Sequence, residues 1–213
     1  FGSHLYLSHA GRGTREATRK SLTSFGLDQC LTVKATLRTM VPSIRCFLDV
    51  DDSAINQEIT LEDHVRRSET FLVMLTKNYI LCPKSRHELA EAVSQRKRLV
   101  VLQEMDENYS AILEGPDVLR LELDIVREKA GVDHDPKAEG HGPNVDRQAK
   151  AQRQAEVDAC EILIGKVERG EAIEWHRQIH LKHAALRHIA QQVYAEHKGL
   201  VDEPLPPVCF ASE

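Results

Sequence analysis

The chain has 213 residues, of which 41% are apolar and 29% are charged, and its formal net charge is -5. Such a length suits one domain with an extension, and a domain of this size can bury a core without disulfides or metal ions. The acidic balance argues against nucleic acid as a partner, because the phosphate backbone favours clustered Lys and Arg, and no apolar run approaches the roughly 18 residues of a membrane span.

The cysteines indicate the compartment. Five of them are scattered along the chain without a C-x-x-C pair, a pattern that weighs against a zinc ribbon and against a disulfide scaffold. We therefore expect a reducing, cytosolic setting. Cys82 lies near Glu88, but no base is indicated beside it, so we expect a buried or half-buried thiol rather than a nucleophile.

Apolar runs separated by polar turns organise the first half of the chain. The runs predict strands over residues 4–7, 44–50, 71–75 and 99–102. Helical spacing predicts helices over residues 14–25, 27–41 and 59–67, and around Glu88. Strands that alternate with helices in this way predict an α/β fold, with a doubly wound, flavodoxin-like parallel sheet and helices on both faces.

The second half of the chain gives a less regular pattern. Leucine and isoleucine alternate with charged residues over residues 119–125, which predicts a half-exposed edge strand. Glycine, proline and charged residues predict a mobile loop over residues 133–143. Two long helices are expected after this loop, over residues 144–169, with Gly170 as the stop, and over residues 175–197.

These elements divide the chain into three parts. Residues 1–132 form the core of the parallel sheet, residues 133–143 the mobile loop, and residues 144–213 the helices that complete or extend the core and end in a proline-rich tail. No internal repeat and no low-complexity tract indicates a further division.

Glu88 is the first candidate for a functional side chain. It lies near the start of the helix that follows the third strand, and ligands of parallel α/β sheets gather beyond the carboxyl ends of the strands. Ser8 and His9 follow the first strand and Asp49 ends the second, so the same edge should collect them. A helix carboxylate taken alone is more often solvated, and we expect Glu88 to be exposed.

Short segments, in chain order, resemble the sequence boxes of the TIR (Toll/interleukin-receptor) domain family. They are Leu5-Tyr-Leu-Ser-His-Ala-Gly-Arg-Gly-Thr-Arg15, Phe47-Leu-Asp49, Leu72-Val-Met-Leu75 with Asn78-Tyr79, Ser85-Arg-His-Glu-Leu89 and, at the expected start of the last helix, Trp175-His-Arg177. The resemblance covers residues 4–104 well and the final helix loosely. The family's glycine in the loop before Ile59 is absent, as are its tryptophan and cysteine beside the glutamate.

Many TIR domains are NAD glycohydrolases, and the resemblance places the family's catalytic carboxylate on Glu88. Cleavage of the nicotinamide–ribose bond passes through an oxocarbenium-like sugar, as in glycoside hydrolysis. Nicotinamide leaves as a neutral group, so one carboxylate that grips the ribose and stabilises the developing charge can supply most of the effect without a metal or a cofactor. NAD+ is then the substrate, and the products are nicotinamide and ADP-ribose or a cyclic ADP-ribose.

The resemblance also implies contacts with the substrate. Ser8, His9 and Arg12 of the first turn would face the nucleotide, with Arg12 suited to its pyrophosphate. Asp49 would lie beside them. Lys84 occupies, one helical turn before the catalytic glutamate, a position where some members carry a tryptophan, which leaves the stacking partner of the nicotinamide open.

Two other functions stay open at this point. A TIR domain can act as a non-catalytic signalling adaptor by self-association, here through the loop that carries Asp51, Asp52, Ile55 and Gln57. In catalytic members the same loop of one subunit completes a neighbour's site, so an active homo-oligomer is expected for the enzyme as well. A nucleotide-binding flavodoxin-like domain outside the family would need a phosphate loop, and Gly11-Arg-Gly13 is too short for one.

Two metal sites are considered and set aside. His176, His180 and His183 share one face of the expected last helix and could hold zinc or nickel, but no Asp, Glu or Cys completes that stripe. A solvated polar face is therefore expected there. Magnesium beside Asp49, as in receiver domains, would require an acidic pair after the first strand, where this chain has a serine and a histidine.

Overall fold

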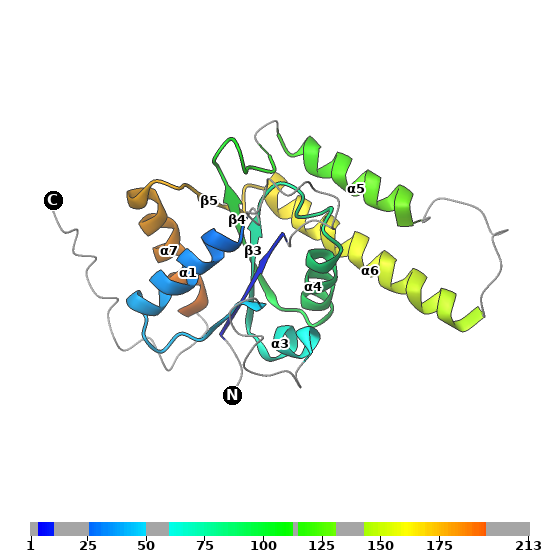
Figure 1. Ribbon diagram of the computed structural model, residues 1–213, viewed down its shortest axis with the longest axis horizontal. Coiled ribbons are helices and arrows are strands. Elements are labelled where there is room, and N and C mark those ends of the chain that lie inside the picture. The colour runs from blue at the N-terminus through cyan, green and yellow to red at the C-terminus, as the bar shows by residue number, and fades with distance from the viewer. Residues whose placement is uncertain (1–3, 11–25, 50–59, 113–114, 131–142, 195–213) are drawn as a thin grey trace, which may run out of the picture.

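The fold is built on a parallel β-sheet (Figure 1). The computed structural model describes residues 4–10, 26–49, 60–112, 115–130 and 143–194. Within these ranges five strands pair in parallel in the order β2-β1-β3-β4-β5. They are β1 (Leu5–His9), β2 (Cys46–Phe47), β3 (Thr70–Leu75), β4 (Arg98–Glu104) and β5 (Ile173–Trp175). This is the flavodoxin-like order, so the predicted α/β class with a parallel sheet is confirmed.

Helices cover both faces of the sheet (Figure 1). One face carries α1 (Leu27–Met40) and α7 (Ile179–Tyr194), and the other carries α3 (Leu61–Arg67), α4 (Pro83–Ser94), α5 (Asp117–Ala130) and α6 (Pro143–Glu168). Alternate side chains of a strand point to opposite faces, so Phe71 and Val73 of β3 join the core under α4 and α6, whereas Leu72 joins the core under α1 and α7. No helix in these described ranges is long and apolar enough to cross a membrane.

Local sequence signals set where three of these helices begin or end. Thr60 caps α3, because its hydroxyl accepts a hydrogen bond from the backbone N–H of Asp63 at 3.2 Å. Pro83 begins α4, a position where its fixed φ and missing N–H are tolerated. Gly170 follows α6 with a φ of 68°, in the left-handed region that favours glycine. The predicted stop at Gly170 is thus confirmed.

The predicted edge strand over residues 119–125 is wrong, because this segment belongs to the helix α5. Leu119 and Leu123 are buried in the core under α4 and α6, whereas Leu121 and Ile125 are 63% and 40% exposed. Four alternating apolar residues contain pairs spaced by four, so the same letters fit a strand and a helix. Two ion pairs on the surface join α5 to α6, Arg120–Glu168 and Arg127–Glu161.

The sequence predicted that the single tryptophan starts the last helix. This prediction is wrong, because Trp175 ends β5. Trp175 is fully buried, and its Nε1 donates a hydrogen bond to Oε1 of Gln29 in α1 at 3.0 Å. α7 begins only at Ile179, so His176 lies before it and the three histidines considered as metal ligands do not share one helix. A strand of three residues is too short to show a period in the sequence, which is why β5 was not predicted.

Some predicted elements lie partly or wholly outside the described residues. The helix expected over residues 14–25 is one of them, and so is the loop over residues 133–143 apart from Pro143, with which α6 begins. β2 is shorter than the strand predicted over residues 44–50, although Ile44 and Leu48, which flank it, are buried.

Candidate active site

Four of the predicted site residues lie at the carboxyl ends of neighbouring strands. Ser8 and His9 are the last residues of β1, Asp49 lies two residues beyond β2, and Glu88 lies in α4, the helix that follows β3. The order of the sheet reverses here, since β2 lies on one side of β1 and β3 on the other. Open parallel sheets bind ligands at such a reversal, so the cluster occupies the place expected of a binding site.

A chain of hydroxyl groups leads to Glu88. The Oγ of Ser8 donates to Oε2 of Glu88 at 2.6 Å and lies 2.8 Å from the hydroxyl oxygen of Tyr79. Because a serine hydroxyl has only one hydrogen, Tyr79 is the donor in the second contact. All three side chains are buried, and a charge-assisted hydrogen bond is strong in such surroundings.

Lys84 connects the two carboxylates of the cluster. Its Nζ donates to Oδ2 of Asp49 and lies 3.6 Å from Oε1 of Glu88, one helical turn further along α4. Burial lowers the pKa of Lys84, but the hydrogen bond to Asp49 and the charges of both acids outweigh it and raise that pKa. The ammonium group is therefore a stable partner of both acids.

His9 faces Asp49 from the end of β1. Its Nδ1 is 2.9 Å from the carbonyl oxygen of Ala10, which can only accept, so Nδ1 carries a hydrogen. Its Nε2 lies 3.4 Å from Oδ1 of Asp49 and, among the described residues, makes no hydrogen bond of ordinary geometry. The contact is an ion pair when the ring holds a second proton, whereas the neutral ring turns a lone pair toward the carboxylate.

Burial and neighbouring charges shift the pKa values of the two acids in opposite directions. Glu88 is 3% exposed, so the prediction that it is exposed is wrong. Burial raises the pKa of Glu88, and the Lys84 charge and the Ser8 hydrogen bond offset this only in part. Burial acts in the same direction on Asp49, but its contacts with His9 and Lys84 hold the pKa of Asp49 well below its usual range. Asp49 is thus a fixed negative charge, while Glu88 can exchange a proton, a division of roles that paired acids show in catalytic sites.

Three buried residues of the cluster were not among the predicted site residues. Tyr79 orients Ser8, and Ser85 donates its hydroxyl hydrogen to the backbone carbonyl of His9 at 2.9 Å, which ties α4 to the end of β1. Tyr6 lies two residues before Ser8 in β1 and therefore on the same face of the strand. That period of two is the sequence signal for Tyr6, whereas the contacts of Tyr79 and Ser85 depend on how the segments pack.

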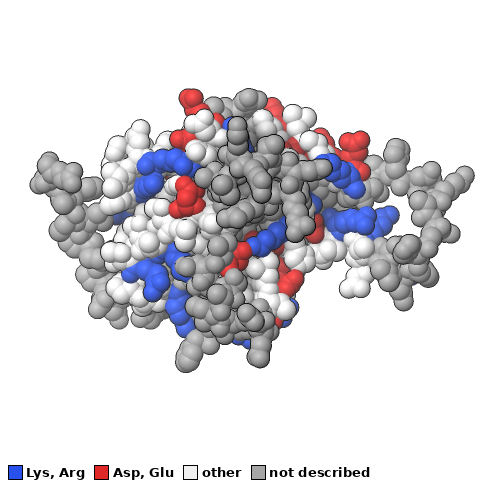
Figure 2. All heavy atoms as spheres, viewed as in Figure 1, with Lys and Arg blue, Asp and Glu red and all other residues white. Residues whose placement is uncertain are grey.

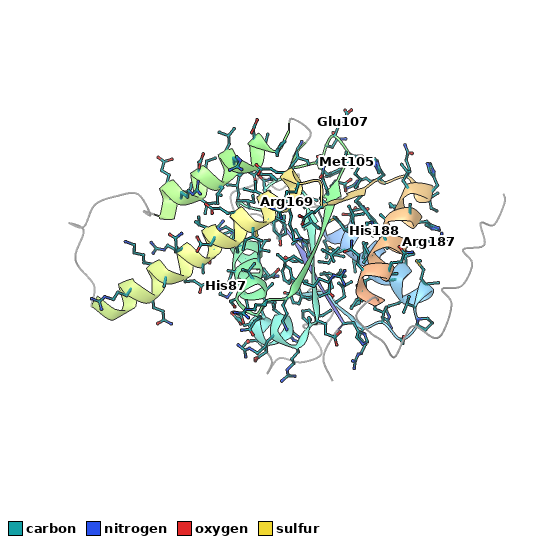
Figure 3. The ribbon with its side chains drawn as sticks, turned by 180° about the vertical axis from the view of Figure 1, so that it is seen from behind. His87, Met105, Glu107, Arg169, Arg187 and His188 are labelled. Carbon is teal, nitrogen blue, oxygen red and sulfur yellow. The ribbon has the colours of Figure 1, made fainter. Side chains whose placement is uncertain are left out.

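The residue beside Glu88 on α4 faces a different part of the molecule (Figure 3). His87 contacts Oε1 of Glu62 in α3 through Nε2 at 2.8 Å, and its Nδ1 accepts a hydrogen bond from Gln152 of α6 at 3.0 Å. Successive residues of a helix are about 100° apart around its axis, so α4 presents Glu88 to β1 and His87 to α3 and α6. These contacts fix the rotation of α4 and with it the direction of Glu88.

The remaining predicted site residues lie outside the described residues. They are Arg12, Asp51, Asp52, Ile55 and Gln57, and their contacts with a substrate or a second chain stay predictions. Cys82 is a half-buried thiol at the N-cap of α4, as expected. In the part of the chain that the structure describes, no group of three or more His, Cys, Asp or Glu side chains could hold a metal ion.

Comparison with known proteins gives a weak likeness in shape alone. No family model matches the chain, and no curated protein matches it. A solved structure of similar shape is that of the TIR domains of the activated Roq1 resistosome directly recognizing the pathogen effector XopQ. Its TM-score is 0.45 at 15% identity, over 90% of this chain and 99% of that chain. This level of likeness decides neither family nor activity, so the fold class is taken from the sheet order and the role of the cluster from its chemistry.

Proposed function

We propose that this chain cleaves the nicotinamide–ribose bond of NAD+, with Glu88 as the catalytic carboxylate. The observation that carries the proposal is the buried Glu88, held by Ser8 and Lys84 at the ligand-binding edge of the sheet. A buried carboxylate with a raised pKa and defined charged partners is a mark of functional sites. The segments that resemble TIR domains suggest the substrate.

The reaction needs little from the protein beyond this carboxylate. The bond between C1′ of the ribose and the pyridinium nitrogen breaks, and its electron pair leaves with nicotinamide, which becomes neutral. The sugar is left with an oxocarbenium-like charge, which ionised Glu88 stabilises in surroundings of low dielectric constant. Water then bonds to C1′ and loses a proton, which gives ADP-ribose, and attack by an adenine nitrogen instead gives the cyclic product.

The charges of the cluster favour a positive group at the reacting end of the substrate. Among the described residues, Asp49 and Glu88 share the ammonium group of Lys84, so the cluster is negative while the His9 ring is neutral. The pyridinium ring of NAD+ is positive until its bond to the ribose breaks. The cluster therefore attracts the pyridinium end of the substrate, and its attraction passes to the sugar when nicotinamide leaves as a neutral molecule.

Self-association and a cytosolic setting belong to the same proposal. In the TIR domains that this chain resembles, the loop after the second strand of one subunit completes the site of its neighbour. The corresponding residues here, Asp51 to Gln57, would give a homo-oligomer whose specific activity rises with protein concentration. NAD+ enters as the substrate, and no step is assigned to a metal or a resident cofactor.

Nicotinamide release from NAD+, measured over a series of protein concentrations with light scattering in parallel, tests the proposal. We expect release, with a specific activity that rises as the protein assembles. Assembly without release, even at the highest concentration and with crowding agents, would refute the enzyme and favour the non-catalytic signalling module. Release that is strictly proportional to concentration would keep the enzyme and refute activation by assembly.

A further inference from the structure

Tyr6 carries a hydroxyl group that packing alone does not explain. Its ring stacks against Phe47 and Phe71, with centroid distances of 5.3 and 5.2 Å, and the residue is fully buried. Among the described residues its hydroxyl makes no hydrogen bond of ordinary geometry. A phenylalanine would stack equally well without burying an unpaired polar group, which costs stability. The hydroxyl therefore calls for a partner in better geometry than any described residue gives it here.

Glu88 is the partner that lies within reach. Tyr6 and Ser8 are two residues apart in β1 and point to the same face, and Ser8 already donates to Glu88. A carboxylate accepts up to about four hydrogen bonds, whereas the second oxygen of Glu88 has only the Lys84 ammonium at 3.6 Å among the described residues. A donor without a hydrogen bond of ordinary geometry and a carboxylate with spare acceptor positions thus face one another, and the Tyr6 hydroxyl already interacts with Glu88.

The hydroxyl groups of this cluster all donate their hydrogen bonds in the direction of the carboxylate. Tyr79 donates to Ser8, and Ser8 donates to Glu88, so the chain of hydroxyls ends on an acceptor. Burial, and after it the charge of Glu88, raises the pKa of Tyr6 well above its usual value. The Tyr6 hydroxyl therefore keeps its hydrogen in the neutral range, and because an ionised carboxylate can only accept, Tyr6 is the donor in any hydrogen bond with Glu88.

We propose that Tyr6 is a positioning residue for Glu88, whose hydroxyl joins that of Ser8 in orienting the carboxylate and keeping it ionised during the reaction. The proposal rests on the proposed function in one respect, the catalytic role of Glu88. Glu88 is faced by the following groups: Lys84 on its own helix, Tyr6, Ser8 and His9 on β1, Asp49 beyond β2 and Tyr79 beyond β3. Among these, Tyr6 is the donor whose hydrogen bond to Glu88 does not reach ordinary geometry in this structure.

Titration of the Glu88 carboxyl group tests this role directly. Protein carrying ¹³C in its glutamate carboxyl groups gives a signal for Glu88, identified as the one that disappears in Glu88→Gln, and its chemical shift follows ionisation. We compare wild type with Tyr6→Phe and, as a matched control on the Ser8 side, with Tyr79→Phe. Each variant keeps the aromatic ring and loses one hydroxyl, and an amide spectrum unchanged outside the site verifies the fold.

A donor to the carboxylate lowers its pKa, so the loss of that donor raises it. We expect the midpoint of the Glu88 titration to rise in Tyr6→Phe by about one unit, which is about tenfold in the ionisation constant. The midpoint of the acid limb in the pH profile of nicotinamide release should move to higher pH by the same amount. If Tyr6→Phe does not fold, 3,5-difluorotyrosine at position 6, a stronger donor, should lower the midpoint instead.

An unchanged midpoint in Tyr6→Phe, beside a raised one in Tyr79→Phe, would assign Tyr6 to packing and overturn the proposal. The titration needs no turnover, so it decides the role of Tyr6 even if the chain does not cleave NAD+. Conversely, nicotinamide release together with an unchanged midpoint would remove Tyr6 from the mechanism and leave the proposed function intact.

Discussion

Glu88 and Asp49 lie in one cluster of side chains but respond to folding in opposite ways. Burial raises the pKa of Glu88, so its contribution to stability is complete below the unfolded pKa and is lost as the pH rises through the folded pKa. For Asp49, burial is outweighed by the contacts with His9 and Lys84, and the pKa falls. The contribution of Asp49 is therefore present above the unfolded pKa and is lost as the pH falls through the folded pKa.

Amide variants of the two acids should therefore change stability with opposite signs. Glu88→Gln resembles the neutral acid and still accepts from Ser8, so its free energy of unfolding at neutral pH should equal or exceed that of wild type. Asp49→Asn gives up a charge that Lys84 and His9 stabilise, so its free energy of unfolding should fall. Urea unfolding at neutral and at acid pH measures both, and the advantage of Glu88→Gln should shrink at acid pH. A Glu88→Gln protein that is clearly less stable than wild type at neutral pH would contradict this account.

Lys84 should set the pH range in which Glu88 works. The charge of Lys84 lowers the pKa of a carboxylate that burial has raised, and Lys84→Met removes the charge while keeping most of the side-chain length. The acid limb of nicotinamide release, where Glu88 becomes protonated, should consequently move to higher pH in this variant. Lys97→Met serves as control, because Lys97 directly precedes β4 and so lies at the opposite edge of the sheet, where it donates to the carbonyl of Arg66. If the acid limb of Lys84→Met lies at the same pH as that of wild type, Lys84 does not act on Glu88.

The sequence predicts the members of the cluster better than it predicts their surroundings. Ser8, His9 and Glu88 each follow a predicted strand and Asp49 lies at the end of one, and parallel strands bring their carboxyl ends to one edge. The burial of Glu88 could not be predicted, because it depends on contacts between segments far apart in the chain. Ser8 and Glu88 are 80 residues apart, and Ser8 and Tyr79 are 71 residues apart.

Among the secondary-structure elements, α5 shows most clearly where sequence periodicity is ambiguous. Its leucines and isoleucine alternate with charged residues, which fits one face of a strand, yet they also include pairs spaced by four. Packing against α6 favours the helix over the strand, because the apolar residues of α6 join Leu119 and Leu123 in one core. The packing partner lies beyond the predicted loop, and a local pattern contains no information about it.

Two alanine variants distinguish the helix from the predicted strand. In a strand, Leu121 and Leu123 would lie on the same face, so Leu121→Ala and Leu123→Ala should cost about the same. In α5 only Leu123 is buried, and Leu123→Ala should lower the free energy of unfolding by about 2–5 kcal/mol. Leu121, which is 63% exposed, should change it by no more than about 0.5 kcal/mol. Equal losses in urea unfolding would contradict the helix.

β5 is too short for its backbone pairing alone to hold it in the sheet, and contacts of the neighbouring side chains hold it in place. Trp175 reaches α1 through Gln29, and Arg177, two residues later, lies 3.8 Å above the ring of Tyr109 and 3.2 Å from a carboxylate oxygen of Glu104. These anchors explain how three residues complete the sheet. They also explain why the tryptophan, taken as the start of a helix, marks the end of a strand.

For the molecule as a whole, the alternation of strands and helices was sufficient to predict the parallel sheet, because each crossover needs a helix to return the chain. Figure 2 shows acidic and basic side chains interspersed over the described part of one face. A mixed surface of this kind creates no strong field of a single sign. In the proposed reaction, the charge that meets the substrate is therefore that of the buried cluster around Glu88, where Lys84 and Asp49 set the local charge.

The most direct test of this account is nicotinamide release from NAD+ by Glu88→Gln at the concentration at which wild type is active. The amide keeps the shape of the side chain and the hydrogen bond from Ser8 but cannot stabilise a positive sugar. We predict a fall of about a hundredfold or more, with a folded protein and with Glu91→Gln, on the same helix, as active as wild type. Release by Glu88→Gln within a few-fold of wild type would contradict the account, because the buried carboxylate would then have no part in the cleavage.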